Sequence, residues 1–235
     1  MVACACFLNP DGRHKEIDAM KRKTMLALVG TAALLVSMSV AAEGQDPRMS
    51  FFVTSAGPGN GGDLGGLEGA DAHCKALAKA AGAPDRDWRA YLSTEEDGKR
   101  GVFARSRIGT GPWYNAQGIL IAADVHDLHM YNKTITLETA LDESGNRIKG
   151  RYDKPNEHDI LTGTMEDGTA YFPDDQDHTC KNWTSSGEGS AQVGHHDRHG
   201  GGNVSWNSAH GSRGCSQEDL TKTGGAGYFY CFAAD

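Results

Sequence analysis

The hydrophobic pattern consists of short apolar runs separated by polar, glycine-rich segments, and one of these runs has helical periodicity. Between residues 67 and 81, apolar side chains recur every three or four positions, which predicts a helix with one buried face. Gly82 and Pro84 predict the end of this helix, and the glycine-rich residues 55–66 before it predict a loop. The inner face of the helix is formed by Ala70, Cys74, Leu77, Ala78 and Ala81.

The remaining apolar runs are short and favour β-strands. Aromatic and β-branched residues or alternation mark them at residues 51–54, 88–93, 118–123, 134–137, 206–208 and 227–232. Residues 142–146 are a turn cluster, so the segments on either side are expected to pair as a hairpin. Residues 185–203 are expected to be almost entirely loop.

Composition supports the fold class that this pattern indicates. Hydrophobic residues make up 38% of the chain and 31 residues are glycine, which is typical of a loop-rich protein with short strands. We therefore expect an α+β domain of short antiparallel strands with one or two helices.

The N-terminal region has the pattern of an export signal. Lys21, Arg22 and Lys23 precede an apolar run over residues 25–40, which ends in small residues. This pattern predicts a cleaved secretory signal peptide and a secreted or periplasmic protein, with an uncleaved anchor as the alternative. The predicted parts are a spurious N-terminal extension (1–19), the signal peptide (20–42), a flexible leader (43–49) and one folded domain (50–235).

Charge narrows the classes of partner. The chain has a formal net charge of −8 and no basic stripe with interleaved aromatic residues, which argues against nucleic-acid binding. It also lacks a basic amphipathic helix, so no stable membrane insertion is expected after signal cleavage.

Four cysteines lie beyond the predicted signal peptide, at Cys74, Cys180, Cys215 and Cys231. An even number in an exported chain indicates two disulfides, and spacing alone leaves all three pairings open. A zinc site is the alternative, although no close pair of cysteines supports it.

The order of these cysteines resembles that of C-type-lectin-like domains. The match extends over most of residues 50–235 and is carried by FFVTS…GDLGGLEGADAHCKALA, LTGTMEDGT, TCKNWTSS and GCSQ…YFYCFA. It is similar to a group of secreted bacterial domains, mostly of unassigned function, that are related in fold to endostatin and C-type lectins. The resemblance implies a C-type-lectin-like fold, the disulfides Cys74–Cys231 and Cys180–Cys215, and carbohydrate binding.

The sequence departs from the calcium-dependent lectins of that fold at the residues that bind the ion. Lys154-Pro155-Asn156 lacks the leading acidic or amide residue, and Trp206-Asn207-Ser208 lacks the final carboxylate. Calcium requires six to eight oxygen ligands, so we do not expect the usual lectin calcium site.

A histidine cluster is the most unusual stretch of the chain. His195, His196 and His199, with Asp197 and Arg198 between them, could supply ligands for Zn²⁺ or a similar ion, and His178 or His210 could join them. The alternative is a hydrogen-bonded polar loop, which we favour because the cation of Arg198 opposes metal binding.

Two further polar clusters are interpreted as surface. Residues 126–129 contain two histidines in a loop-like context. Residues 174–177, with Glu166 and Asp167, could bind Ca²⁺, but they lack EF-hand spacing and favour an exposed acidic loop.

The tryptophans are expected either in the core or at a ligand-binding surface. Trp183 is expected in the core because it lies close to Cys180, whereas Trp206 could be either core or a platform for a sugar. The candidate ligand-binding residues are Trp206, Asn207, Arg198 and Asp197.

The sequence contains no motif of a nucleophile elbow or a zinc protease, so we do not expect an enzyme. The leading hypothesis is an extracellular lectin-like module that binds a glycan or surface ligand through the loops between Cys180 and Cys215. The alternatives are an exported metal-binding protein or enzyme centred on residues 195–199, with Ca²⁺ or Zn²⁺ as candidate cofactors, and a structural or adhesive surface protein.

Overall fold

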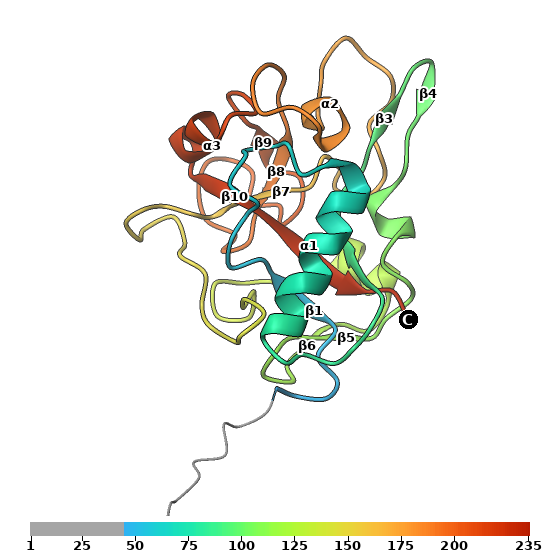
Figure 1. Cartoon of the computed structure of the whole chain (residues 1–235), viewed down its shortest axis with the longest axis vertical. Coiled ribbons are helices and arrows are strands. Elements are labelled where there is room, and N and C mark those ends of the chain that lie inside the picture. The colour runs from blue at the N-terminus through green and yellow to red at the C-terminus, as the bar shows by residue number, and fades with distance from the viewer. Residues whose placement is uncertain (1–44) are drawn as a thin grey trace, which may run out of the picture. The chain divides into compact units, whose positions relative to one another are not determined.

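A six-stranded mixed sheet organises residues 45–235, the part of the chain that the computed structural model describes (Figure 1). The strand order is β1-β10-β7-β8-β9, and β2 also pairs with β10. The strands are β1 (Phe51–Val53), β2 (Trp88–Ala90), β7 (Asp159–Leu161), β8 (Gln192–His195), β9 (His210–Gly211) and β10 (Gly225–Ala233). Two small ribbons lie outside this sheet: β3 (Glu95–Glu96) with β4 (Lys99–Arg100), and β5 (Trp113–Tyr114) with β6 (Leu120–Ala122).

Strand β10 is central because its side chains are buried on both faces. Phe229 and Cys231 belong to one hydrophobic cluster, while Tyr230 and Phe232 belong to the other. Successive residues of a strand point to opposite faces, so an aromatic strand of this kind separates two core layers. The predicted terminal strand is therefore confirmed and is longer than expected.

Helix α1 (Gly66–Ala80) covers one face of the sheet. Its buried residues are Ala70, Cys74 and Ala78, and the helix packs against β2. These residues lie on the face that the sequence pattern indicated, so the predicted helix is confirmed. A second helix, α3 (Gln217–Thr223), is capped where the Asp219 N–H donates to Ser216 Oγ at 3.1 Å. Two shorter segments are a 3₁₀ helix, η1 (Ala104–Ser106), and a π-helical turn, η2 (Asp127–Tyr131).

The four-residue turn α2 (Cys180–Trp183) is left-handed. All of its residues have positive φ, with values of 47, 53, 57 and 66°. None of them is glycine, and L-residues adopt this conformation at a cost of about 1–2 kcal/mol each. The turn is held by Asp177, whose carboxylate accepts the backbone N–H of Lys181 at 3.0 Å, and by Thr179, whose Oγ1 accepts that of Asn182 at 3.0 Å.

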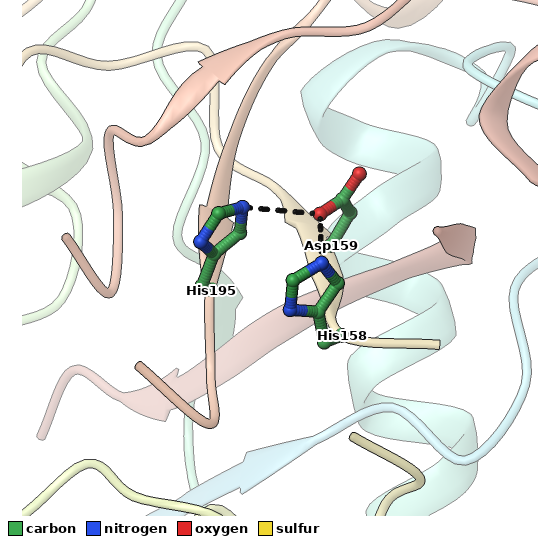
Figure 2. A group of neighbouring side chains, drawn as sticks. All are labelled: His158, Asp159 and His195. Atoms are coloured by element: carbon green, nitrogen blue, oxygen red, sulfur yellow. Dashed lines mark ion pairs between the residues drawn. The ribbon is translucent and has the colours of Figure 1, made fainter. Parts of the chain in front are cut away.

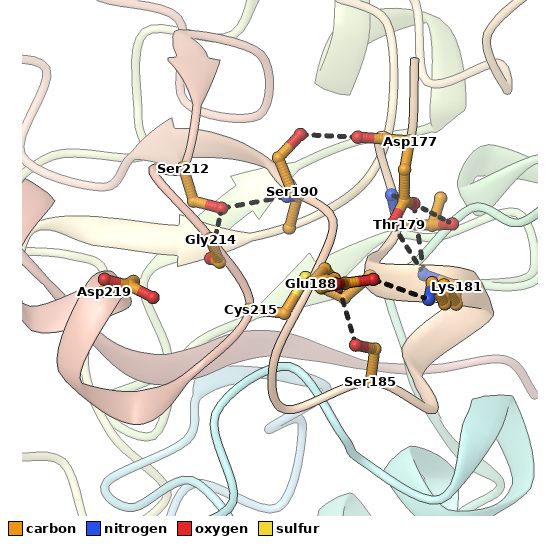
Figure 3. Close-up of a disulfide and its surroundings, with 12 residues drawn as sticks. Asp177, Thr179, Lys181, Ser185, Glu188, Ser190, Ser212, Gly214, Cys215 and Asp219 are labelled. Carbon is orange, nitrogen blue, oxygen red and sulfur yellow. Dashed lines mark hydrogen bonds and ion pairs between the residues drawn. A yellow bond between two sulfur atoms is a disulfide. The ribbon is translucent and has the colours of Figure 1, made fainter. Parts of the chain in front are cut away.

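Two nested disulfides are present. Cys74 on α1 joins Cys231 on β10, and Cys180 on α2 joins Cys215, so the pairing implied by the resemblance is confirmed. Figure 3 shows the second disulfide among the polar contacts that fix its loop. In that loop Ser185 Oγ donates to the Glu188 carbonyl at 2.7 Å, and Ser212 Oγ donates to the Gly214 carbonyl at 2.8 Å.

Several local predictions are wrong, and tertiary pairing explains each difference. Residues 134–137 and 206–208 form no strand, whereas residues 185–203, expected to be loop, contain β8. Strand β8 exists because β7 and β9 pair with it on either side. The strands are also not uniformly antiparallel, because β10 pairs with β7 in parallel. The hairpin around residues 142–146 is reduced to one antiparallel bridge between Leu141 and Arg147.

The prediction of a flexible leader over residues 43–49 is wrong for its last residues. Met49 is fully buried and bridges to Tyr114, and the Asp46 N–H donates to the Ala116 carbonyl at 3.3 Å. The folded part therefore begins before residue 50.

The predicted N-terminal extension and signal peptide fall in residues 1–42, outside the described residues. Within residues 45–235, no helix has the length and apolar character needed to cross a membrane.

Candidate functional site

Three histidines converge on the carboxylate of Asp159, the first residue of β7. His195 stands directly opposite Asp159 in the antiparallel β7–β8 pair, so the two side chains share one face of the sheet. His195 Nε2 lies 3.3 Å from Asp159 Oδ1, and His158 Nε2 lies 3.1 Å from the same oxygen. Figure 2 shows both imidazoles directed at the same oxygen of the carboxylate. From the next strand, His210 Nε2 reaches within 3.5 Å of Asp159 Oδ1.

The centre of this cluster is buried. His158, Asp159 and His195 are 3% exposed or less, while the side chain of His210 is 40% exposed at the edge. One ligand atom from each of His158, Asp159 and His195 lies within 4.8 Å of the other two. Among residues 45–235 no other group of three histidine, cysteine, aspartate or glutamate side chains meets this condition.

The short contacts in the cluster are not hydrogen bonds. Neither carboxylate oxygen of Asp159 has a hydrogen-bond partner in the described part of the chain, and neither ring nitrogen of His195 has one. Leaving buried polar atoms unpaired costs about 1–3 kcal/mol per group. Asp159 Oδ1 and His195 Nε2 face each other at 3.3 Å without a hydrogen bond, and the Nε2 atoms of His158 and His210 approach the same oxygen. This convergence on one unpaired oxygen indicates that a further species belongs between these groups.

The outer contacts of the imidazoles fix which nitrogen carries the proton. His158 Nδ1 lies 3.1 Å from Asp197 Oδ1, and His210 Nδ1 lies 3.0 Å from the Gly211 carbonyl oxygen. Both partners are acceptors, so each Nδ1 donates, and in a neutral ring this leaves Nε2 with a lone pair. Those lone pairs face the carboxylate of Asp159, an arrangement that only a cation or added protons can stabilise.

The charges around the cluster are consistent with this arrangement. Burial opposes ionisation of Asp159, but the imidazoles of His195 and His210 more than offset it and hold the pKa of the carboxyl below its usual value. Burial likewise opposes ionisation of Asp197, whose pKa is held well below its usual value by His158 and the backbone N–H of Arg151 and of His199. Asp197 accepts from Arg151 at 2.7 Å and from His199 at 3.1 Å, so it is a rigid support for His158.

The structure does not bring together His195, His196 and His199, the metal ligands suggested by the sequence. His196 is buried on a different contact, with Nε2 3.1 Å from the Lys149 carbonyl oxygen, and burial lowers its pKa to about 4. His199 is exposed, and its ring lies 5.6 Å from that of Tyr152. Neighbouring residues at the end of a strand point in different directions, so a cluster in sequence is divided in space. Of the two histidines that could join, His210 does so, whereas His178 stacks on Tyr171 at 3.7 Å.

Sequence reasoning missed His158 and Asp159. The pair precedes the apolar run Ile160-Leu161, which is a recognisable strand signal. Its distance from His195 is 36 positions, and only the β7–β8 register places the two together.

Three of the four candidate ligand-binding residues line one cavity of about 340 Å³. They are Trp206, Asn207 and Arg198, whereas Asp197 belongs to the histidine cluster. Trp206 is only 4% exposed, and its ring lies 4.9 Å from Tyr91, so it is mainly a core residue. The Asn207 carboxamide donates to Tyr91 Oη at 3.0 Å, so this side chain is also engaged within the protein.

The other sequence clusters have structural roles in the described residues. The surface interpretation of residues 126–129 holds for the exposed His126, whereas His129 is half-buried and its Nε2 lies 2.7 Å from Tyr91 Oη. Trp183 is fully buried and donates to the Ser93 carbonyl at 2.7 Å, so its core assignment is confirmed. In the acidic loop, Asp174 and Asp177 accept backbone N–H groups of residues 176, 179 and 181.

No protein-family model matches the chain, and no curated protein matches it significantly.

Proposed function

We propose that this chain is an exported, disulfide-stabilised domain that binds a divalent transition-metal ion, with zinc as the preferred ion. The ligands are His158, Asp159 and His195, and His210 completes the set from the edge of the cluster. The observation that carries this proposal is the convergence of three imidazole Nε2 atoms on Asp159 Oδ1, an oxygen that has no hydrogen-bond partner among the described residues.

The spacing of the ligand atoms supports a tetrahedral ion. Zinc–nitrogen and zinc–oxygen bonds of about 2.0–2.2 Å in a tetrahedron place neighbouring ligand atoms about 3.3–3.6 Å apart. The three nitrogens lie 3.1, 3.3 and 3.5 Å from Asp159 Oδ1. The ligand atoms of His158, Asp159 and His195 lie within 4.8 Å of one another, and His210, which lies outside that group and is the most exposed, would move towards them to complete the set.

The ligand types favour zinc over calcium. Calcium takes six to eight oxygen ligands, whereas three imidazoles and one carboxylate suit zinc and its neighbours in the first transition series. The Asp197–His158 contact has the form of the carboxylate–histidine–metal support found at zinc sites. Four protein ligands leave no position for a reacting water, so the proposed role is structural or regulatory rather than catalytic.

Metal content tests the proposal directly. The protein is treated with EDTA, reloaded with excess zinc, desalted and analysed by inductively coupled plasma mass spectrometry. We expect one zinc per chain in the wild type and less than a tenth of that in His195→Ala. The matched control is His199→Ala, an exposed histidine four positions away, which retains the wild-type zinc content.

A milder substitution keeps the proposal testable if His195→Ala does not fold. His210 lies at the exposed edge, so His210→Ala keeps the fold, checked by near-ultraviolet circular dichroism, and lowers zinc affinity at least tenfold. Wild-type protein that retains no metal would overturn the proposal and would assign the balancing charge to protons on the imidazoles.

A second function is favoured by the cavity beside this cluster. Three residues suggested by the sequence as ligand-binding line that cavity, which supports recognition of a glycan or surface ligand by a lectin-like domain. Two disulfides are typical of proteins in oxidising compartments, which supports a secreted or periplasmic location. Binding to a glycan array, with and without Ca²⁺, tests recognition, and the absence of binding under both conditions would contradict it.

A further inference from the structure

The cavity beside the histidine cluster contains a cation that the protein itself does not neutralise. We infer that it binds a sugar residue bearing a carboxylate, such as a hexuronic acid, with Arg198 contacting that carboxylate. This inference rests on the proposed recognition function and is independent of the metal. The volume of the cavity, about 340 Å³, lies at the lower end of the range for small-molecule sites, which suits a single sugar residue.

The charge of Arg198 has no partner of opposite sign. Within the described residues, no carboxylate lies within 4.0 Å of its guanidinium. Its Nε donates to the Ile135 carbonyl at 2.7 Å, and its Nη2 donates to the Asn132 carbonyl at 2.7 Å. These neutral carbonyls orient the group and leave its positive charge uncompensated, although the side chain is half-buried. An anion from outside would supply the missing charge.

The backbone of Arg198 supports a role for its side chain. Its φ is +54°, a conformation that glycine adopts freely and that costs other L-residues about 1–2 kcal/mol. Glycines 200–202 follow after His199, so the loop already contains residues suited to such a turn. Strained residues cluster at functional sites, so this conformation is consistent with a functional role for Arg198.

The remaining lining of the cavity suits a sugar acid. Met130 and Val204 are 61% and 46% exposed and provide apolar surface for the face of a sugar ring. Glu166 is exposed on the lining and can accept hydrogen bonds from hydroxyl groups. The guanidinium of Arg198 has already used some of its donors within the protein, and the carboxylate of Glu166 lies on the same lining. A singly charged ligand is therefore favoured over a phosphate dianion.

The test compares glucuronate with its uncharged amide, glucuronamide, by NMR titration of the indole N–H signals. We expect the Trp206 signal to shift, and glucuronate to bind at least tenfold more tightly than glucuronamide. Arg198→Gln is expected to abolish that preference, while the exposed Arg213→Gln serves as the matched control and leaves it unchanged.

A variant at the rim keeps the inference testable if Arg198→Gln does not fold. Val204→Asp adds a negative charge to an exposed position of the cavity and is expected to weaken glucuronate binding at least tenfold. Val102→Asp, at a comparably exposed valine outside the cavity lining, is expected to have no effect.

The outcomes distinguish failure of this inference from failure of the proposed glycan recognition. Equal binding of glucuronate and glucuronamide would overturn the role of Arg198 while leaving sugar recognition intact. No binding of either probe, together with no binding on a glycan array, would overturn both. Unchanged binding after EDTA treatment is expected, because none of the contacts invoked passes through the metal ligands.

Discussion

The left-handed turn at residues 180–183 shows how a single residue can be strained by the contacts around it. Lys181 has a φ of 53°, and its side chain is exposed, with one long ion pair of 3.9 Å to Glu188. Such an exposed pair contributes little, so its loss would not offset relief of the backbone. Figure 3 shows the hydrogen bonds from Asp177 that hold the backbone of Lys181 in place.

Replacing Lys181 with glycine is therefore expected to stabilise the protein. Glycine removes about 1–2 kcal/mol of conformational strain and loses about 0.4–1 kcal/mol through greater freedom of the unfolded chain. We predict a net gain of about 0.5–1 kcal/mol in the free energy of unfolding, measured by urea denaturation. Lys75→Gly, at an exposed right-handed position of α1, is the control and is expected to lose about 1 kcal/mol. A loss of stability in both variants would contradict the prediction.

At the scale of elements, the Cys180–Cys215 segment supplies half of the proposed ligands. His195 on β8 and His210 on β9 lie inside this segment, whereas His158 and Asp159 lie on or beside β7 outside it. The disulfide restricts the segment and thereby holds one pair of ligands against the other. The Cys74–Cys231 disulfide joins α1 to β10, and neither of these elements carries a ligand, although all four ligands lie within the long segment that this disulfide closes.

Removing the two disulfides should therefore have different consequences. Loop-closure entropy gives an upper estimate of about 5 kcal/mol for Cys74–Cys231 and about 4 kcal/mol for Cys180–Cys215. We predict that Cys180→Ala with Cys215→Ala weakens zinc affinity at least tenfold in folded protein. Cys74→Ala with Cys231→Ala should lower the unfolding temperature more and leave zinc affinity within twofold. Chelator competition measures the affinity, and equal losses in both double variants would contradict the assignment.

The same elements show which features the sequence could predict. Helix α1 and strand β10 were predictable because the helix carries a helical periodicity of apolar residues and the strand is a run of aromatic residues. Strand β8 was not, because Gln192-Val193-Gly194-His195 is polar and glycine-containing and is stabilised by its neighbours. The metal ligands depend on the registers of β7, β8 and β9, which hydrogen bonds between distant segments determine. Arg198, Trp206 and Asn207 were predictable as candidates from composition, but their cavity was not.

For the whole molecule, metal binding is expected to appear as stability. An ion that binds only the folded state at a hundred times its dissociation constant adds about 2.7 kcal/mol. For a domain of this size we predict an increase of about 5–10 °C in the unfolding temperature on adding zinc, measured by calorimetry. His195→Ala should abolish the increase, and magnesium should not reproduce it. A zinc-induced increase of the same size in His195→Ala would place the ion elsewhere.

Strand β10 also determines when the molecule can fold. It is the partner of β1, β2 and β7, yet it follows all three in the chain. During synthesis those strands leave the ribosome before their common partner exists, with the edges that pair with β10 still unpaired. The Cys74–Cys231 bond must wait for the same strand. Assembly of this sheet is therefore a late event, and a nascent chain stopped before residue 225 is expected to leave the partner edges of β1, β2 and β7 exposed.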